Sequence, residues 1–436
     1  MEFPSILHSM TTRAIKQVLK FISPTIAQFK AFPVLLSNSH DVLYQAPTGS
    51  GKSLVYLASQ IELALPLAAQ DRIACLVLVP NRELGEQVHT LTNKLLTYHQ
   101  LKSTALLGGV KSRNEDIECL NRDKPEIVIA TPGRLAHHIE KTAYFADTLK
   151  NMQSFVIDEA DFIMSQGIDH QLDLILKCLP KNKRTTLVSA TITEDIKRLS
   201  SKLFRPHFLH VDCGNSVDHL KQAVVVCHGE NIMTALYSLV TTHQKTVVFF
   251  PTAQTATFAF RIFKEKLKVS VRLLHGKLAV SDRVRELKRF TTEIKSVLFT
   301  TDLAARGIDF HHVNLILQVH VPINIEQYIH RVGRTARAGP TGEAILLISK
   351  EEKAFISQII QHTPSLTVSE FNPSQISHTF KLATQSWAIS DPDLLAEAAD
   401  TRRSLVGYFE AGPARTYRIA CSRLIAENFI KSAGYQ

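Results

Sequence analysis

Short apolar runs rich in β-branched residues recur along this chain every few tens of residues, and longer stretches with helical spacing separate them. In the first half these runs are Ile73–Val79, Ile127–Ala130, Phe155–Ile157 and Thr186–Val188. Such alternation is typical of a parallel β-sheet that is covered by helices. The sequence therefore predicts an α/β fold.

The same alternation begins again in the second half of the chain. Its predicted strands are Val224–Val226, Thr246–Phe250, Val271–Leu274, Ser296–Thr300, Val313–Val319 and Ala344–Ile348. Between the halves, Pro206, Gly214, Asn215 and Ser216 interrupt the periodicity and indicate a linker. Beyond about residue 365 the strand pattern stops, and the segments Leu394–Ala399, Arg402–Tyr408 and Arg418–Ile430 have helical spacing. We expect one domain over 1–208, a linker over 209–220, a second domain over 221–364 and a small, basic helical C-terminal extension over 365–436.

The composition agrees with two cored domains, because 45% of the 436 residues are hydrophobic. Lys and Arg number 50 against 40 Asp and Glu, and the net charge of +10 favours a polyanionic partner such as nucleic acid. Charge alone leaves this open, since many basic proteins bind no nucleic acid. The six cysteines form no C-x-x-C pair, and no uncharged apolar run approaches the roughly 18 residues of a membrane span. We expect neither a zinc site nor a membrane partner.

A glycine-rich string lies between the apolar run Val42–Tyr44 and the helical run Leu54–Leu65. It reads Ala46-Pro47-Thr48-Gly49-Ser50-Gly51-Lys52-Ser53. Glycines let the backbone curl so that amide N–H groups surround phosphates, Lys52 can reach the β and γ phosphates, and the Ser53 hydroxyl can coordinate Mg²⁺. The competing interpretation is a chance glycine-rich turn. The strand, loop and helix context favours a nucleotide-phosphate site.

The apolar run Phe155–Ile157 ends in three carboxylates within four residues, at Asp158, Glu159 and Asp161. Like charges repel, so a cation and a water molecule at this strand end explain the cluster better than chance does. Asp158 would hold Mg²⁺, and Glu159 would orient and deprotonate an attacking water. A solvated acidic loop is the alternative.

Together these strings resemble the DEAD-box RNA helicase family over roughly residues 3 to 350. The segment Asp158–Asp161 matches the motif that names the family, Ser189–Thr191 is similar to the segment that couples hydrolysis to unwinding, and His330–Arg337 is similar to the arginine-rich motif of the second domain. The resemblance implies two tandem RecA-like domains with parallel sheets flanked by helices. It also implies ATP and Mg²⁺ as cofactors.

The resemblance assigns roles residue by residue. Catalytic roles fall to Lys52, Asp158, Glu159, Arg334 and Arg337, the two arginines acting as fingers on the γ-phosphate. Nucleotide contacts fall to Phe21, Gln28, Ala46, Thr48, Gly49, Ser50, Gly51, Lys52, Ser53 and Asp309, with Phe21 stacking on the adenine that the amide of Gln28 reads. Mg²⁺ ligands are Ser53 and Asp158. Coupling falls to Asp161, Ser189, Thr191, His330 and Arg331, and RNA binding to Arg82, Gly109, Thr131, Arg134, Thr252, Thr301 and Arg306. In isolation, the arginine cluster could be a solvated helix face and the RNA-binding tripeptides could be ordinary turns.

Three positions depart from the family pattern. Ala336 stands where the family usually has Gly, Asn81 where it has Thr, and Gly85 where it has Ala. The change at Ala336 removes no charge and the predicted catalytic residues are all present, so we expect activity to survive. Asn81 is expected to change a hydrogen bond to RNA.

The resemblance implies an ATP-dependent RNA helicase and RNA chaperone that binds single strands largely without sequence preference, separates short duplexes locally and works as a monomer. A protein activator or adaptor stays open. The alternative from another class is an ATP-dependent RNA clamp with little turnover, which intact Glu159, Arg334 and Arg337 disfavour. A DNA helicase is disfavoured by Gln28 and by Asp158–Asp161.

The C-terminal segment mixes basic and aromatic residues. It loosely resembles the helical extension of organellar DEAD-box RNA chaperones, through Arg402-Arg-Ser-Leu-Val-Gly-Tyr-Phe409 and Leu424-Ile-Ala-Glu-Asn-Phe429. Its helices could grip flanking RNA or could only pack on the second domain. If the kinship holds, a mitochondrial or plastid location follows, and otherwise a cytoplasmic or nuclear one.

Overall fold

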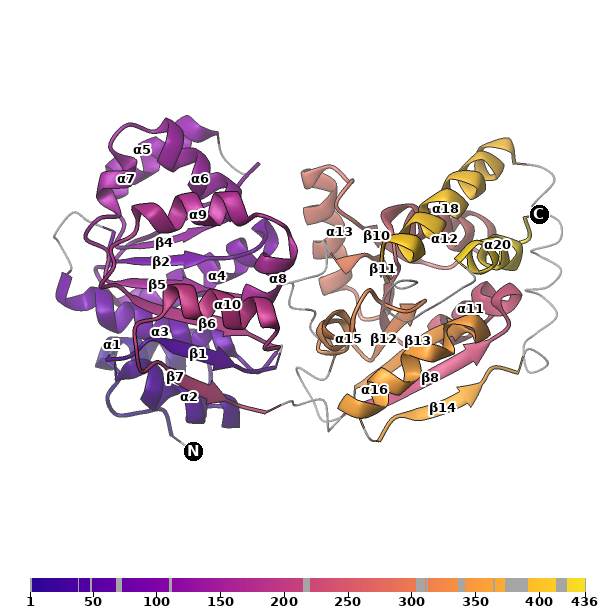
Figure 1. The fold of residues 1–436 in the computed structure, drawn as a ribbon, viewed down its shortest axis with the longest axis horizontal. Helices are drawn as coiled ribbons and strands as arrows, with labels where there is room; N and C mark the ends of the chain where they lie inside the picture. The colour runs from indigo at the N-terminus through magenta and orange to yellow at the C-terminus, as the bar shows by residue number, and fades with distance from the viewer. Residues whose placement is uncertain are drawn as a thin grey trace. The chain divides into compact units, whose positions relative to one another are not determined.

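The structure is a computed structural model that describes residues 2–37, 39–47, 49–67, 73–109, 112–214, 220–302, 310, 313–335, 342–363, 365–372, 391–412 and 422–435. The chain divides into two compact units, Met1–Ser216 and Val217–Gln436. Each unit contains one parallel β-sheet and its covering helices (Figure 1). The predicted α/β class is confirmed.

The first unit is built on a seven-stranded sheet in the order β3-β4-β2-β5-β6-β1-β7. Its strands are β1 (Val42–Gln45), β2 (Cys75–Leu78), β3 (Ser103–Leu106), β4 (Ile127–Ala130), β5 (Ser154–Ile157), β6 (Arg184–Ser189) and β7 (Leu209–Asp212). Every pair is parallel. The carboxyl ends of the strands therefore share one edge of the sheet, where α/β proteins bind ligands.

Ten α-helices of this unit are described. They are α1 (Ser9–Arg13), α2 (Ile26–Leu36), α3 (Lys52–Ala64), α4 (Arg82–Leu95), α5 (Arg113–Asp123), α6 (Pro132–Lys141), α7 (Phe145–Thr148), α8 (Ala160–Ser165), α9 (Asp169–Cys178) and α10 (Glu194–Leu203). Alternate strand residues enter two separate cores, for example Val77 on the side of α2, α3 and α4 and Leu76 on the side of α6 to α10. Burial on both faces explains why these strands are continuous apolar runs.

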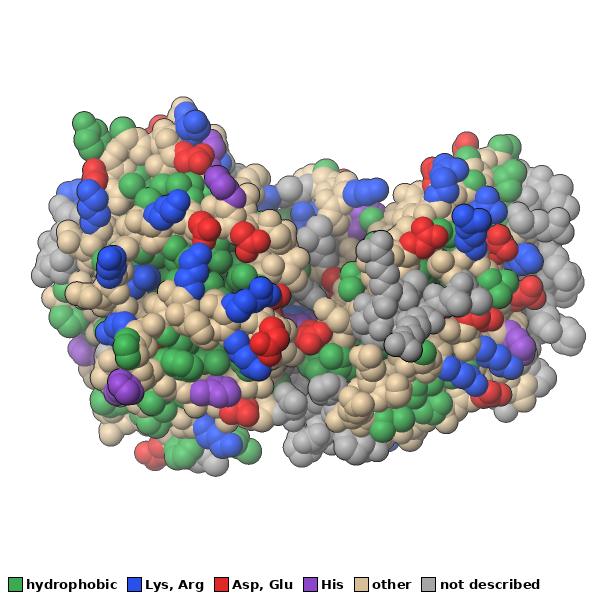
Figure 2. Space-filling view, in the orientation of Figure 1, with side chains coloured by type: hydrophobic (Ala, Val, Ile, Leu, Met, Phe, Trp, Pro, Cys, Tyr) green, Lys and Arg blue, Asp and Glu red, His purple; other side chains and the backbone are tan. Residues whose placement is uncertain are grey.

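Charge is mixed on the face of the first unit that carries α9 and α10. Figure 2 shows Lys and Arg interspersed with Asp and Glu there. Several of them form exposed ion pairs, including Lys202 with Asp173 and Lys197 with Glu194. The surplus of positive charge is therefore not gathered into one patch on this face.

The second unit repeats the architecture with the strand order β10-β11-β9-β12-β13-β8-β14. Its strands, again all parallel, are β8 (Lys221–Cys227), β9 (Lys245–Phe249), β10 (Val271–Leu274), β11 (Ser296–Thr300), β12 (Leu315–Val319), β13 (Glu343–Ser349) and β14 (Thr367–Glu370). Its described α-helices are α11 (Ile232–Thr242), α12 (Ala253–Arg261), α13 (Val280–Thr292), α15 (Ile325–Val332), α16 (Ile356–His362), α18 (Pro392–Ala411) and α20 (Ser422–Ser432).

The structure differs from the predicted linker and from the predicted end of the second domain. The linker was expected to start at residue 209, but Leu209–Asp212 forms β7, which pairs with β1. The strand pattern was expected to stop at residue 365, but Thr367–Glu370 forms β14, which pairs with β8. Both are short edge strands whose side chains are mostly exposed, so they lack the apolar run that marks a buried strand.

The C-terminal helices belong to the core of the second unit, where the sequence had suggested a separate small element. Leu394, Leu405, Phe409 and Phe429 are fully buried in the same apolar cluster as the strands. The Tyr408 hydroxyl donates to the Val321 carbonyl at 3.0 Å. None of the described helices is both long and apolar enough to cross a membrane.

Candidate functional site

The predicted phosphate-binding, carboxylate, coupling and RNA-binding motifs of the first unit lie at the carboxyl edge of its sheet. The glycine-rich loop follows β1, the carboxylate cluster follows β5, and Ser189–Thr191 lies at the end of β6. The predicted RNA-binding loops follow β2, β3 and β4 in the same way. Because neighbouring parallel strands end side by side, one fold brings together segments that are distant in sequence.

The glycine-rich loop has the backbone that its motif requires. Gly49 and Gly51 have φ angles of 80° and 82°, a region that favours glycine. Lys52 is the first residue of α3, and its ammonium group donates to the Ala46 carbonyl at 2.8 Å. The Ala46 amide donates to the Ser189 carbonyl at 3.1 Å, which joins the loop to β6. Thr48 lies outside the described residues.

Gln28 braces this loop from α2. Its amide nitrogen donates to the Gly51 carbonyl at 3.1 Å, and its amide oxygen accepts from the Thr25 backbone at 2.9 Å. A side chain at Gly51 would place its Cβ 2.2 Å from that amide nitrogen, so the close approach also requires glycine. Phe21, the predicted adenine-stacking residue, is 45% exposed. Adenine reading by Gln28 and Phe21 stays a prediction.

The two predicted Mg²⁺ ligands, Ser53 and Asp158, share Tyr56 as a neighbour. The Tyr56 hydroxyl donates to Asp158 Oδ2 at 2.7 Å and is hydrogen-bonded by the Ser53 side chain. Asp158 is 2% exposed, and burial together with the charge of Glu159 raises its pKa to about 6. A hydroxyl and a carboxylate at one point suit Mg²⁺, which takes one or two protein oxygens and completes its shell with water and phosphate. The residues fit the ion.

Glu159 is held in a strained conformation directly after Asp158. Its φ angle is 46°, which is uncommon for a residue other than glycine, and its amide donates to Asp158 Oδ1 at 2.9 Å. Such strain costs free energy and clusters at functional sites. This conformation and its hydrogen bond place the start of α8 directly after Glu159.

Asp161 contacts the predicted coupling segment. Its Oδ2 accepts from the Thr191 hydroxyl at 2.7 Å, and the Ser189 hydroxyl donates to the Thr191 carbonyl at 2.7 Å. Ser189 in turn binds Ala46 through its backbone. A continuous set of hydrogen bonds therefore joins the carboxylate cluster, the coupling segment and the glycine-rich loop.

The two predicted RNA-binding arginines of the first unit, Arg82 and Arg134, both contact the segment that follows β3. Arg82 donates to the Gly109 carbonyl at 3.1 Å, and Arg134 binds the carboxylate of Asp116 at 2.7 Å. Thr131 precedes α6 and donates its amide to the Leu106 carbonyl at 3.1 Å. The structure thus brings Arg82, Gly109, Thr131 and Arg134 to one edge of the sheet.

Two departures from the family pattern have structural reasons. The Asn81 side chain accepts from the Leu84 amide at 2.9 Å and caps α4, a task that Thr also performs. A Cβ at Gly85 would lie 2.4 Å from the Leu107 side chain, so Leu107 occupies the space that an alanine would need. Ala336 lies outside the described residues.

In the second unit, Arg331 and Arg334 are buried. Arg331 is bound by both carboxylate oxygens of Asp302, at 2.8 and 2.6 Å, and also approaches the Gln318 side chain at 3.3 Å. Arg334 is 2% exposed and donates to the carbonyl of His330, which is also buried. The predicted sites Arg306, Asp309 and Arg337 lie outside the described residues.

Thr252 and Thr301 follow β9 and β11, again at carboxyl strand ends. Thr252 caps α12, and its hydroxyl lies 2.9 Å from that of Ser404 in α18.

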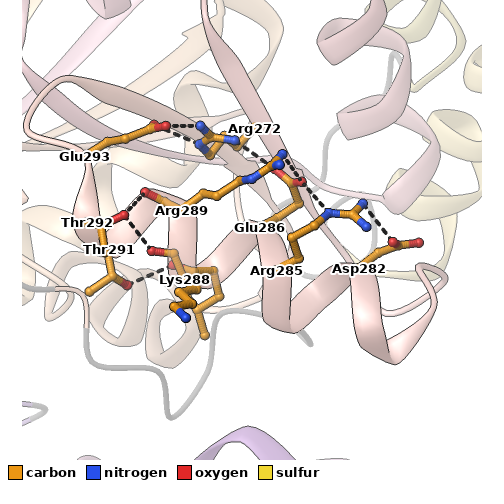
Figure 3. Close-up of polar contacts among 10 residues, drawn as sticks. Arg272, Asp282, Arg285, Glu286, Lys288, Arg289, Thr291, Thr292 and Glu293 are labelled. Atoms are coloured by element: carbon orange, nitrogen blue, oxygen red, sulfur yellow. Dashed lines mark hydrogen bonds and ion pairs between the residues drawn. The ribbon is translucent and has the colours of Figure 1, made fainter.

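The neighbouring helix α13 carries a network of ion pairs (Figure 3). Glu286 binds Arg272, Arg285 and Arg289, and Arg272 also binds Glu293. These arginines therefore form ion pairs with acidic residues of the same unit.

Reasoning from the sequence missed Tyr56, Asp302 and Asp116, which hold predicted site residues in place. Tyr56 lies three residues after Ser53 on a helix, a spacing that puts both on one face and could have identified it. The other two contacts link separate elements, and neither spacing nor composition indicates them.

Comparison with known proteins agrees with this geometry. The family model for the DEAD/DEAH box helicase matches residues 25–199, and that for the helicase conserved C-terminal domain matches residues 230–339. The chain is 34% identical to the probable ATP-dependent RNA helicase DDX10 of Gallus gallus, over 85% of this chain and 42% of that protein. It is 31% identical to DEAD-box ATP-dependent RNA helicase 26 of Oryza sativa subsp. japonica, over 80% of this chain and 67% of that protein.

Solved structures match almost the whole chain. The structure of Mss116p bound to ssRNA and AMP-PNP is 26% identical, has a TM-score of 0.85, and the match covers 99% of this chain and 89% of that one. Mss116 bound to ssRNA and UDP-BeF gives 25% identity and a TM-score of 0.87, with the same coverage. The chain spans about half the length of the first curated relatives that it matches. Two family models match this chain in tandem, and the carboxylate motif follows the strand on which it was expected. This chain therefore belongs to the DEAD/DEAH box helicase family.

Proposed function

We propose that this chain is an ATP-dependent RNA helicase that hydrolyses ATP to ADP and phosphate and separates short RNA duplexes locally. The observation that carries the proposal is the hydrogen-bonded connection from Ala46 through Ser189 and Thr191 to Asp161. It connects the loop that would hold the phosphates of ATP to the carboxylate motif that would act in ATP hydrolysis. The curated relatives named above are RNA helicases, and Mss116p was solved with ssRNA and AMP-PNP, which supports both substrates.

The residues divide the chemistry among them. The amides of the glycine-rich loop and the ammonium group of Lys52 would hold the phosphates. Ser53 and Asp158 would hold Mg²⁺, which when bound neutralises charge that develops on the phosphates. Glu159 would orient the attacking water and accept its proton. We assign Arg334 and Arg337 to the γ-phosphate as arginine fingers, a contribution of about 10³ to 10⁵ in rate in other phosphoryl-transfer enzymes.

RNA would be held through its sugar-phosphate chain, by Arg82, Arg134 and the backbone near Gly109 and Thr131 in the first unit. The second unit would add Thr252, Thr301 and Arg306. Contacts of this type fix the position of a strand and carry little sequence information. We therefore expect binding of single-stranded RNA of many sequences, and contacts to the ribose 2′-hydroxyl would favour RNA over DNA.

The competing function is an ATP-dependent RNA clamp with little turnover. A strand-separation assay distinguishes the two: a short RNA duplex with one labelled strand is incubated with the protein and either ATP or a non-hydrolysable analogue. The proposal predicts repeated displacement of the labelled strand with ATP. Stable RNA binding with both nucleotides, and displacement that never exceeds one duplex per protein, would instead identify a clamp.

A further inference from the structure

A buried carboxylate lies beneath one of the predicted RNA-binding arginines. Asp116 in α5 is 2% exposed, and its Oδ2 is 2.7 Å from both Nε and a terminal nitrogen of Arg134. The same oxygen is 3.1 Å from Nε2 of His138, which is fully buried. A buried carboxylate is costly unless it is paired and hydrogen-bonded, and this one has both kinds of partner.

Local structure fixes all three side chains. Arg134 and His138 are four residues apart on α6, so both lie on one face of that helix. Asp116 stands in the first turns of α5, whose start is fixed by a capping box in which Ser112 and Glu115 exchange hydrogen bonds. The His138 ring also packs against Phe145, with ring centroids 5.5 Å apart.

The histidine is oriented at both ring nitrogens. Its Nδ1 is 3.0 Å from the Thr142 hydroxyl, and its Nε2 faces Asp116. The tautomer with the proton on Nε2 satisfies both contacts, because that nitrogen donates to the carboxylate while Nδ1 accepts from Thr142. His138 therefore keeps Asp116 in place, and Asp116 keeps Arg134 in place.

We propose that Asp116 and His138 are positioning residues that hold the Arg134 guanidinium ready for an RNA phosphate. Arginine has five N–H donors in a rigid fork, so one guanidinium can bind a carboxylate and a phosphate at the same time. Fixing the side chain before RNA arrives removes the ordering cost that a free arginine would incur on binding. This inference rests on the proposed function, in which Arg134 contacts RNA.

The test is steady-state ATP hydrolysis by the full chain as a function of poly(U) concentration. Asp116→Asn and His138→Leu are expected to raise the half-saturating RNA concentration about tenfold, because each weakens a charge-assisted contact in the network. His138→Gln, whose amide can donate to Asp116, should lose less. The KM for ATP should stay unchanged in all three. Asp123→Asn is the matched control, since Asp123 lies on the same helix and makes an exposed ion pair with Arg122.

Arg134→Ala distinguishes the RNA contact of Arg134 from the positioning role of Asp116 and His138. If Arg134→Ala leaves the half-saturating RNA concentration unchanged, the proposed RNA contact of Arg134 fails. If Arg134→Ala raises that concentration but Asp116→Asn and His138→Leu do not, the positioning role is wrong. The double variant Asp116→Asn with Arg134→Ala excludes a general loss of stability: positioning predicts no further shift beyond that of Arg134→Ala, whereas an additive shift would overturn the inference.

Discussion

Asp161 and Thr191 are 30 residues apart in sequence and joined by a hydrogen bond of 2.7 Å between Oδ2 and the threonine hydroxyl. They follow the neighbouring parallel strands β5 and β6. The contact fixes the last carboxylate of the motif against the segment that was predicted to couple hydrolysis to unwinding. A substitution in either segment is therefore expected to alter the position of the other.

Thr191→Val tests that coupling. Valine has the shape of threonine but no hydroxyl, so the variant loses the hydrogen bond to Asp161 and leaves a carboxylate oxygen less satisfied, at a cost of about 1–3 kcal/mol. We expect strand separation to fall at least tenfold while RNA-stimulated ATP hydrolysis falls less than threefold, measured on the same preparations. Thr193→Ala is the control: its hydroxyl accepts from the Ile196 amide and caps α10 without touching Asp161. Equal loss of both activities in Thr191→Val would argue against coupling through this contact.

Gly85→Ala should destabilise the first unit, although alanine is the residue that the family pattern favours there. The new Cβ would lie 2.4 Å from the side chain of Leu107, which is buried. Overpacking of this kind costs about 1–3 kcal/mol of the free energy of unfolding. Chemical denaturation would measure it, and Leu107→Val in the same chain should recover part of the loss. An unchanged unfolding midpoint in Gly85→Ala would show that the clash relaxes at little cost.

Phe409→Ala should lower the stability of the second unit by about 3–5 kcal/mol, the usual cost of removing a buried aromatic ring. Phe409 is fully buried and packs edge-on against His320 at 5.7 Å. Arg403→Ala on the same helix should change stability by less than about 0.5 kcal/mol, because its ion pair with Asp400 is exposed. Thermal unfolding measures both. Weaker RNA binding by Arg403→Ala would show that α18 also contacts RNA.

Acid should destabilise the second unit through His275. This side chain is buried, its Nε2 lies 2.9 Å from the Thr257 hydroxyl, and burial, with the charges of Lys277 and Arg283, lowers its pKa. The native state keeps His275 neutral, whereas the unfolded chain takes up a proton below about pH 6.5. Stability therefore falls as the pH drops below that value. His275→Gln should flatten the dependence of the unfolding midpoint on pH between 7.5 and 5.5; an identical slope in both proteins would contradict this.

Most of the fold was predictable because buried parallel strands are continuous apolar runs. Ile127–Ala130, Val271–Leu274 and Ser296–Thr300 have the predicted bounds. The exposed edge strands β7 and β14 gave no such signal, and neither did β3, whose residues alternate between buried and partly buried. Three C-terminal segments were predicted to be helical, and the structure joins Leu394–Ala399 and Arg402–Tyr408 into the single helix α18. The place of these helices in the core depends on distant partners that helical spacing does not reveal.

The site was predictable where short strings carry the chemistry, as in the glycine-rich loop and in Asp158–Asp161. These strings do not indicate which other residues hold each side chain of the site in place. Gln28 braces Gly51, Tyr56 joins Ser53 to Asp158, and these contacts arise only when strands and helices pack. Such supporting residues leave no local pattern in the sequence.

RNA-dependent ATP hydrolysis by this chain is measured in the steady state with and without single-stranded RNA, and single-stranded DNA is the control. The native chain is compared with Glu159→Gln, which keeps the shape of the side chain and removes the base. We expect strong stimulation by RNA, little by DNA, and loss of hydrolysis in the variant while RNA binding in the presence of ATP persists. Hydrolysis that RNA does not stimulate, or that survives in Glu159→Gln, would contradict this expectation.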